Sequence, residues 1–274
     1  MKAKTALIRL WAVLACAVTL GAIFFLFAYI FANGAHVITW KFLTDIPRGL
    51  IIGTEGGILP AIVGSLWYTG IACAFATVLG IGTAICQVFY CKNEKLSGAI
   101  AMVMQCMAGV PSIVMGLFGY SLLVLALGWG KCILAGGITQ GIMILPFIQV
   151  RAEKALREID MSQVHASYAM GASRAYTIRR IVLPQCVSQL ISGVILGGCY
   201  AMGAAAPLIF TGAVIMSKVP KSVMKPAMAL PYHLYMLLTQ GTSADNAYGT
   251  AFVMMMIVLV TNTLATWFAW RRRK

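Results

Sequence analysis

Six apolar stretches, each long enough to cross a lipid bilayer, constrain what this chain can fold into more than any other feature. A bilayer core about 30 Å thick requires about 20 apolar residues in a helix. The sequence reaches that length at residues 10–32, 59–90, 97–127, 132–150, 185–216 and 248–270. It therefore predicts an all-α, polytopic membrane helical bundle with six transmembrane helices. Because the connections are short, residues 1–274 are expected to form a single domain.

Composition supports insertion into a membrane and argues against nucleic acid as a partner. Hydrophobic residues make up 61% of the chain and charged residues 10%, whereas soluble domains are roughly half apolar and one quarter charged. The formal net charge is +14, but the basic residues flank the apolar runs. Charges in that position orient a membrane protein, while a nucleic-acid binder carries a basic face with stacking aromatics. We therefore expect membrane lipid, and no nucleic acid, around this chain.

The first apolar stretch follows Lys2, Lys4 and Arg9, in the manner of a signal peptide. A signal peptide has an apolar core of about 7–15 residues, and the run at 10–32 is longer. It is therefore interpreted as an uncleaved first span.

The distribution of Lys and Arg between the two faces predicts the orientation. With the N-terminus inside, 15 of the 21 basic residues lie on the inner face. The outer ones are Lys41, Arg48, Lys131, Lys218, Lys221 and Lys225. Since cytoplasmic loops carry the excess of basic residues, and an even number of spans returns the chain to its starting side, both termini are expected in the cytoplasm.

Two prolines interrupt apolar runs and mark a candidate transport path. Pro111 and Pro207 each remove a backbone donor, and lipid tolerates the resulting kink or break only if neighbours or a cavity satisfy the freed carbonyls. Ser112, Tyr200 and Thr211 lie nearby and could donate hydrogen bonds to an anion at mid-membrane. The alternative is that the prolines are packing kinks and the hydroxyls bond between helices.

No pattern in the sequence indicates an enzyme, a cofactor or a metal site. The eight cysteines form no CxxC pair and have no metal-ligand spacing with histidine, and His36, His165 and His233 are scattered over two faces. The GxxxxGK[ST] phosphate cradle is absent from the sequence. The predicted spans contain almost no ionisable residues, which disfavours a proton- or sodium-coupled carrier and leaves an autonomous channel as a weaker alternative.

The longest polar interruption, residues 151–184, is interpreted as a cytoplasmic docking loop. Gly171 lies near its centre, where a glycine can adopt positive φ and allow a sharp turn between two short helices. Arg174, Arg179 and Arg180 either contact an acidic partner surface or only set the topology.

This loop resembles the signature of binding-protein-dependent ABC importer permeases: Glu-Ala-Ala, three residues, Gly, nine residues, then Ile-x-Leu-Pro. Here it is His165-Ala166-Ser167, Gly171, and Ile181-Val182-Leu183-Pro184. In that family the segment forms the coupling helices, which sit in a cleft of the ATP-hydrolysing subunit. The resemblance implies that the ATPase-coupling residues are His165, Ala166, Ser167, Gly171, Arg174, Leu183 and Pro184.

Further stretches, in order along roughly residues 40–270, are similar to the phosphate importer permeases of the PstA type. They are Phe42–Thr44 ahead of Glu55–Ile58, then Ala61–Leu66, Gly109–Phe118, Ala206–Gly212 and Leu230-Pro231. On this resemblance the permease core covers about 59–270, with 151–184 as its coupling segment. The implied substrate-pathway residues are Pro111, Ser112, Tyr200, Pro207 and Thr211.

The chain departs from that pattern at three positions. His165 stands where the family has the Glu of its coupling signature. The family's fifth span carries an Arg and a Glu in an Arg-Ala-x-Gly-Glu-Thr-Ala-Pro run, and here Tyr200 and Ala204 occupy those places. Intramembrane charges mark substrate paths, so phosphate and another oxyanion both stay open as the substrate.

The resemblance also implies partners and a location. It implies two copies of an ATP-binding subunit, a second permease subunit and an extracytoplasmic phosphate-binding protein, in the inner membrane of a bacterial or archaeal cell. Transport would proceed by alternating access, with no ATPase site in this chain. Lys218, Lys221 and Lys225 form a basic outer patch that either steers an anion, docks the binding protein or is a solvated loop.

Overall fold

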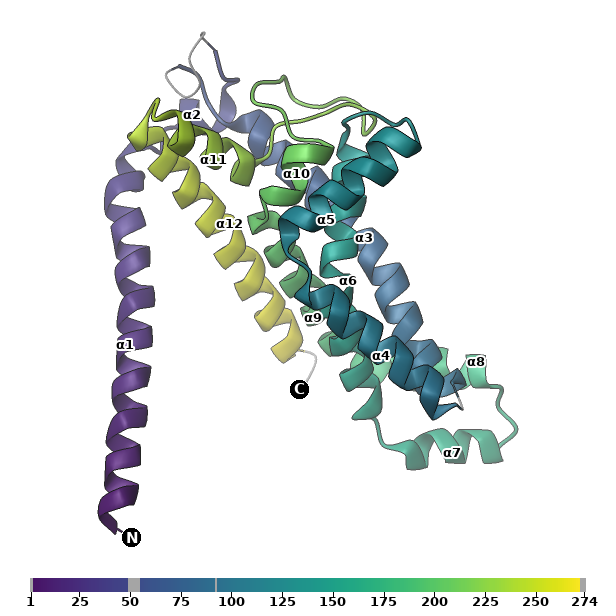
Figure 1. Ribbon diagram of the computed structural model, residues 1–274. Coiled ribbons are helices and arrows are strands. Elements are labelled where there is room, and N and C mark those ends of the chain that lie inside the picture. The colour runs from purple at the N-terminus through teal and green to yellow at the C-terminus, as the bar shows by residue number, and fades with distance from the viewer. Residues whose placement is uncertain (1, 49–54, 92, 272–274) are drawn as a thin grey trace.

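The computed structural model describes residues 2–48, 55–91 and 93–271, and its elements are helices throughout (Figure 1). The elements are α1 (Lys2–Gly34), η1 (Ala35–Val37), α2 (Trp40–Thr44), α3 (Leu59–Ile85), η2 (Cys86–Tyr90), α4 (Glu94–Gly109), α5 (Ser112–Gly119), η3 (Tyr120–Ala126), α6 (Ile133–Arg157), α7 (Met161–Ala169), α8 (Arg174–Thr177), η4 (Ile178–Val182), α9 (Leu183–Gly203), α10 (Ala206–Thr211), α11 (Leu230–Gln240) and α12 (Ala244–Arg271). Three of the short elements, η2, η3 and η4, are π-helical continuations of neighbouring helices.

The prediction of six membrane-crossing segments is confirmed, with one of them broken. Five helices are long and apolar enough to cross, and α4 with α5 and η3 make a sixth segment bent by 101°. α4 begins at the end of the bundle where α7 lies, and α6 starts at the opposite end (Figure 1). The bent pair therefore crosses the membrane, because the chain has to change ends between α3 and α6.

Three predicted span boundaries are corrected by the structure. The stretch 97–127 is not one helix, because Pro111 stands at the break between α4 and α5. The fourth span continues past residue 150 to Arg157. The fifth, expected at 185–216, is helical from Arg174 to Gly203 and is followed by the separate α10. Polar residues close to the membrane surface continue a helix without disturbing its backbone bonds, so hydropathy alone misses the polar end of the fourth span and the polar start of the fifth.

α6 is the central helix of the bundle. Of its spanning window 72% is buried, and it packs against α3, α9, α4 and α5. Small residues allow this close approach: a Cβ added at Gly137 would lie 2.7 Å from Ile71 and one at Gly141 would lie 2.9 Å from the Phe75 ring. In lipid, such backbone proximity replaces the hydrophobic effect as the source of helix association.

α1 stands apart from the rest of the bundle over most of its length (Figure 1). None of its spanning window is buried. Its last turns attach to α12, where the Tyr29 and Tyr248 hydroxyls are 3.2 Å apart and the Phe31 and Phe252 rings are 5.6 Å apart. Gly34 lies so close to Tyr248 that an added Cβ would be 2.6 Å from its carbonyl oxygen.

At the end of the bundle opposite α7, the loop between α10 and α11 is fixed onto α3 and α6 by its two ends. Residues 211–213 and 227–230, here called the cap base, are all buried. Ser65 Oγ accepts a hydrogen bond from the Leu230 amide at 2.7 Å, and the Tyr68 hydroxyl bonds both the amide and the carbonyl of Ala227 at 3.3 Å. Tertiary contacts thus satisfy backbone groups that have no regular secondary structure to pair with.

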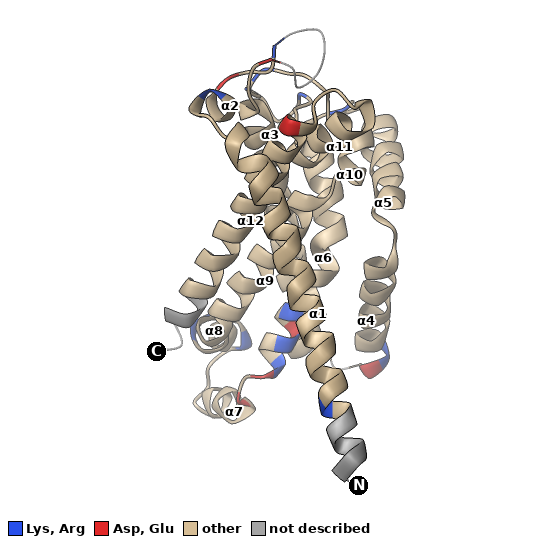
Figure 2. Cartoon of the chain, turned by 90° about the vertical axis from the view of Figure 1, so that its left-hand side faces the viewer, with Lys and Arg blue, Asp and Glu red and all other residues tan. Residues whose placement is uncertain are grey.

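Lys, Arg, Asp and Glu gather at the two ends of the bundle and leave the middle band of the described chain free of them (Figure 2). The start of α1 and the end of α12 lie at the same end as α7 (Figure 1). Both described termini are therefore on one side, as an even number of crossings requires. Lys92 and residues 272–274, which entered the charge count, lie outside the described residues.

Candidate functional site

The coupling segment begins with a capped helix. Asp160 is the N-cap of α7, and its carboxylate accepts hydrogen bonds from the Ser162 amide at 2.9 Å and the Ser162 hydroxyl at 2.7 Å. Both bonds stabilise the charged form and hold the pKa of Asp160 below its ordinary value. The cap satisfies one of the free amides at the start of α7 and defines where this helix begins after α6.

Gly171 ends α7 in the way the sequence predicts. Its φ is +79°, its amide donates to the Tyr168 carbonyl at 2.9 Å, and the Ala172 amide donates to the Ser167 carbonyl at 3.2 Å. These two bonds form a Schellman motif, which needs a left-handed residue just beyond the helix. Ser173 then caps α8 by accepting from the Tyr176 amide at 3.3 Å. The result is a helix–turn–helix that projects from the bundle (Figure 1).

α7 has an exposed face and a buried face. His165, Ala166 and Met170 are exposed, and Met170 retains 88% of its possible surface. Ser167 is buried and its hydroxyl lies 2.8 Å from that of Thr177, which ties α7 to α8. An open groove of about 800 Å³ runs between these two helices. It is lined by Gln163, Ala166, Ser167, Met170, Gly171, Ala172, Ser173, Tyr176 and Ile181.

An apolar cluster anchors the segment to the bundle. Leu156 of α6, Val164 of α7 and Val182 of η4 are fully buried together, and Leu183 packs against them. Pro184 is exposed in the first turn of α9, directly after the π-helical segment η4. α7 is therefore held at one face and free at the other.

The structure thus places five of the seven predicted coupling residues on one projecting unit but exposes them unequally, whereas Leu183 and Pro184 lie in α9. The exposed residues on α7, the turn and α8 are His165, Ala166, Gly171 and Arg174. Ser167 is buried, and its hydroxyl bonds that of Thr177 within the unit. The His165 ring lies 6.5 Å from the Tyr168 ring in an edge-on arrangement. Arg179 and Arg180 are also exposed, one turn further along.

The two proline breaks bring the first turns of α5 and α10 together within the bundle. Gly116 of α5 lies so close to α10 that an added Cβ would be 3.0 Å from the Ala206 carbonyl oxygen and from the Pro207 Cα. α9 ends at Gly203, and Ala204 leaves the helix in an extended conformation. Two interrupted spans therefore meet at this position.

Gln140 of α6 is a residue at this break that the sequence motifs did not point to. Its side-chain amide donates to the carbonyls of Ala201 and Ala204 at 2.9 and 3.2 Å, at the point where α9 ends. It is buried, and its Oε1 has no hydrogen-bond partner among the described residues. Because lipid offers no water to free carbonyls, this donor stabilises the break. A polar amide within an apolar run was the available signal.

The predicted pathway residues are placed differently from one another. Tyr200 is half-exposed and its ring lies 4.9 Å from that of Phe147. Ser112 is half-buried at the start of α5, next to the exposed Pro111. Thr211 does not fit the expectation, because it is fully buried and its hydroxyl donates to the Pro207 carbonyl of its own helix at 2.7 Å. In this conformation Thr211 stabilises α10 and offers no donor to a passing anion.

Acidic, histidine and cysteine side chains do not cluster into a metal site. Within the described residues there is no group of three or more of them close enough to hold an ion. All eight cysteines are free. At the end opposite α7, Lys218, Lys221 and Lys225 are exposed on the loop above the cap base.

The fold and this site define a class: a helical membrane subunit whose broken spans meet in the bundle and from which a helix–turn–helix unit projects. Residues 76–273 match the family described as binding-protein-dependent transport system inner membrane component. The chain belongs to that family, the membrane permeases of ABC transporters.

Curated relatives match nearly end to end. The probable ABC transporter permease protein YqgI of Bacillus subtilis is 29% identical over 97% of this chain and 94% of its own. The probable phosphate transport system permease protein PstA of Methanocaldococcus jannaschii is 31% identical over 89% and 86%.

Solved structures share the fold. The MetNI methionine ABC transporter in an inward-facing conformation matches with a TM-score of 0.66 at 17% identity, covering 78% of this chain and 95% of that one. A bacterial alginate ABC transporter, in complex with its pentasaccharide-bound periplasmic protein, matches with a TM-score of 0.65 at 14% identity, covering 97% and 96%. At these identities the likeness establishes the fold alone.

Proposed function

We propose that this chain forms half of the translocation pathway of an ATP-driven phosphate importer and couples to a separate ATPase. The observation that carries the proposal is the α7–turn–α8 unit. Its Gly171 lies at the signature spacing, its outer face is exposed, and its inner face is anchored to α6 and α9. Two copies of the ATP-binding subunit serve the complex, one of them docking at the groove beside α7.

The partners follow from the same family. A second permease completes the pathway, and a binding protein delivers the anion at the end opposite α7, where the exposed lysines of residues 218–225 lie. The family description itself names dependence on a binding protein. In the proposed complex α7 and both termini lie in the cytoplasm of a bacterial or archaeal cell, and the excess of basic residues on that side supports this orientation.

The continuity of α8, η4 and α9 supports a lever mechanism. These elements form one helical stretch from Arg174 to Gly203. A displacement of α8 by the ATPase is therefore passed to the α9–α10 break along one continuous helical stretch, through η4 and the first turn of α9. At that break α10 contacts Gly116 of α5, so the movement is passed to the second interrupted span. Closing and opening the ATPase dimer would alternate the access of the pathway between the two faces.

Phosphate is the favoured substrate because relatives over most of the chain are named phosphate transport permeases. Another oxyanion is the second candidate, supported by the uncharged region around the breaks. Tyr200 and Ala204 stand where charges are expected, and the buried polar group next to Ala204 is the neutral Gln140. Neutral hydrogen-bond donors bind an oxyanion more weakly than an arginine does, and they discriminate less by its charge.

The test is purification of the complex from its native membrane, followed by an ATPase assay in proteoliposomes with the co-purified binding protein. Phosphate and sulfate would be compared as stimulating anions. Co-purification of an ATPase and a second permease, with stimulation by phosphate, is the expected result. Stimulation by sulfate alone would mean that sulfate and not phosphate is the substrate, and the coupling role would stand. A chain that purifies without an ATPase would overturn the proposal.

A further inference from the structure

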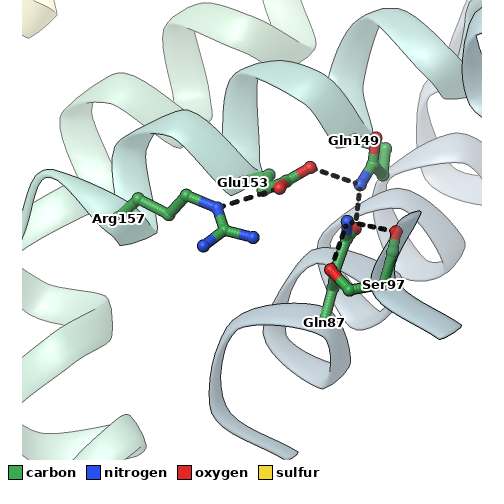
Figure 3. Close-up of polar contacts among 5 residues, drawn as sticks. All are labelled: Gln87, Ser97, Gln149, Glu153 and Arg157. Atoms are coloured by element: carbon green, nitrogen blue, oxygen red, sulfur yellow. Dashed lines mark hydrogen bonds and ion pairs between the residues drawn. The ribbon is translucent and has the colours of Figure 1, made fainter. Parts of the chain in front are cut away.

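Five polar side chains at the α7 end form one continuous chain of hydrogen bonds across three helical elements (Figure 3). Gln87 of η2 donates to the carbonyl and the hydroxyl of Ser97 in α4, both at 3.2 Å. Gln149 of α6 donates to Gln87 Oε1 at 2.8 Å and to Glu153 at 3.1 Å. Glu153 also accepts from Arg157 Nε at 2.9 Å. We call these five residues the polar latch.

The latch is buried at its centre and exposed at one end. Gln149 is fully buried and Gln87 is 3% exposed, whereas Arg157 is largely exposed. Burying two amides is unfavourable unless both are hydrogen-bonded, and Gln149 Oε1 has no partner among the described residues. Packing alone would be served better by apolar side chains here. The cluster is therefore better suited to fixing one relative position of the helices than to maximising stability.

α4 needs such a fixing point because it packs weakly. Of its 16 residues only Met104 is buried, and Ile100 and Met107 pack partly against the same cluster on α6. Towards its N-terminal end, Ser97 is bonded to Gln87. Since α4 leads directly to the Pro111 break and α5, whatever sets the angle of α4 also sets the position of that break.

The other end of the latch leads to the coupling segment. Glu153 and Arg157 lie in the last turns of α6, and α7 begins at Met161 after the Asp160 cap. Leu156, between them in sequence, belongs to the buried cluster that anchors Val164 of α7. A movement of α7 is thus applied to α6 at the same turns that carry the latch.

We propose that Gln149 and Glu153 are positioning residues of the coupling reaction: they hold α4 to α6, so that displacement of the coupling segment moves α4 and the Pro111 break with it. This rests on the proposed coupling to an ATPase. It gives the machinery a second route to the pathway, through α6 and α4, besides the direct one along α8 and α9. Neither residue lines the groove beside α7.

Gln149→Leu in the complete reconstituted complex tests the proposal. Leucine has a similar volume but cannot bond Gln87 or Glu153. Basal ATP hydrolysis is expected to persist, while stimulation by anion-loaded binding protein and anion uptake per ATP fall about tenfold, within the range of ordinary allosteric coupling. Glu153→Gln keeps an acceptor for Gln149 but loses the ion pair, so its effect should be smaller. The matched control is Gln189→Leu, which removes the exposed α9 bond to Glu158 and does not touch α4.

A distance measurement separates positioning from a merely structural role. Spin labels at the exposed Met102 of α4 and Val150 of α6 should give one narrow distance distribution in the parent complex and a broad one in Gln149→Leu. If Gln149→Leu fails to fold, Ser97→Ala, which removes one half-buried acceptor of the Gln87 amide, should show the same broadening to a lesser extent.

The outcomes are distinguishable. Unchanged stimulation and an unchanged distance distribution in a folded Gln149→Leu complex overturn the latch. If Gln149→Leu does not fold and Ser97→Ala does, unchanged stimulation and an unchanged distance distribution in Ser97→Ala overturn the latch. Absence of ATP-dependent uptake in the parent complex instead overturns the proposed function on which the latch rests.

Discussion

The cap base and the coupling segment lie at opposite ends of the same bundle, and they are built in opposite ways. The cap base has irregular backbone, yet residues 211–213 and 227–230 are all buried and bonded to α3 and α6. The coupling segment has regular helices, yet α7 exposes one whole face and is held by one apolar cluster. Regular secondary structure therefore does not indicate which end is rigid.

The difference has a thermodynamic meaning. Opening the cap base would expose Leu230, Met228 and several backbone groups at once, so it can open only with much of the fold. The coupling segment can shift by breaking fewer contacts, because α7 is held at one face only, by the buried cluster that contains Leu156 and Val164. The proposed lever mechanism requires one fixed end and one end that can shift.

The largest effect on stability is expected where the cap base packs against α3. A Cβ at Gly64 of α3 would overlap the Met228 carbonyl, so Gly64→Ala should destabilise the protein by about 3 kcal/mol through overpacking. Thermal unfolding of the detergent-solubilised protein measures this. Gly70→Ala is the matched control on the same helix, because nothing lies within 4 Å of its added Cβ. Equal melting temperatures for the two variants would contradict the rigid cap base.

Next in size is a pH effect at the same end. His233 of α11 is buried, its amide bonds the Ala229 carbonyl at 2.8 Å, and burial lowers its pKa to about 4. Between pH 6.5 and 4 the unfolded chain binds a proton that the folded chain does not, so stability falls as pH falls. The full loss is about 3 kcal/mol by linkage.

His233→Gln should flatten this part of the stability-versus-pH curve, and His36→Gln, at an exposed position, should leave it as it is. Melting temperatures between pH 7.5 and 4.5 give the comparison. A parent protein whose stability does not change over that range would show that His233 is accessible to solvent, and hence that this end is looser than its contacts indicate.

Gln140 lies at the end of α9, outside both regions, and its substitution should have an intermediate effect. Gln140→Leu leaves the Ala201 and Ala204 carbonyls at the end of α9 without their side-chain donor, at a cost of about 2 kcal/mol. Anion uptake should fall with it, because the break loses its fixed geometry. Thr139→Val, which removes only a bond within α6, is the control. Comparable uptake by the two variants would mean that the break does not depend on Gln140.

The smallest effect on stability, about 1 kcal/mol, is expected at the coupling segment. Gly171→Ala places a side chain at positive φ, which should shift the α7–α8 turn and weaken binding of the ATPase subunit. Gly128→Ala introduces the same strain, at φ +67°, in a loop at the opposite end. Co-purification of the ATPase should therefore fall for the first variant and not for the second. If both variants retained the ATPase equally, the turn at Gly171 would not be part of the docking surface.

Hydropathy and motif spacing predicted the crossing segments, the breaks at Pro111 and Pro207, and the turn at Gly171. They did so because each depends on residues close together in the chain. The 101° bend in the third crossing was not predicted, since a proline indicates a break but not its angle. Nor was the burial of Thr211, which follows from the packing of α10 on α5 and α6.

The sequence by itself determined that this protein is a helical membrane permease with six apolar segments, and that a long polar interruption with Gly171 near its centre separates two of them. Insertion into lipid is governed by the apolar length of each stretch, which is a local property. Only the tertiary structure decided that Gln140 reaches the end of α9, that Gln149 joins Gln87, and that the cap base is rigid. Those contacts join residues about 60 to 165 positions apart, and which polar groups find partners within a bundle depends on how its helices pack.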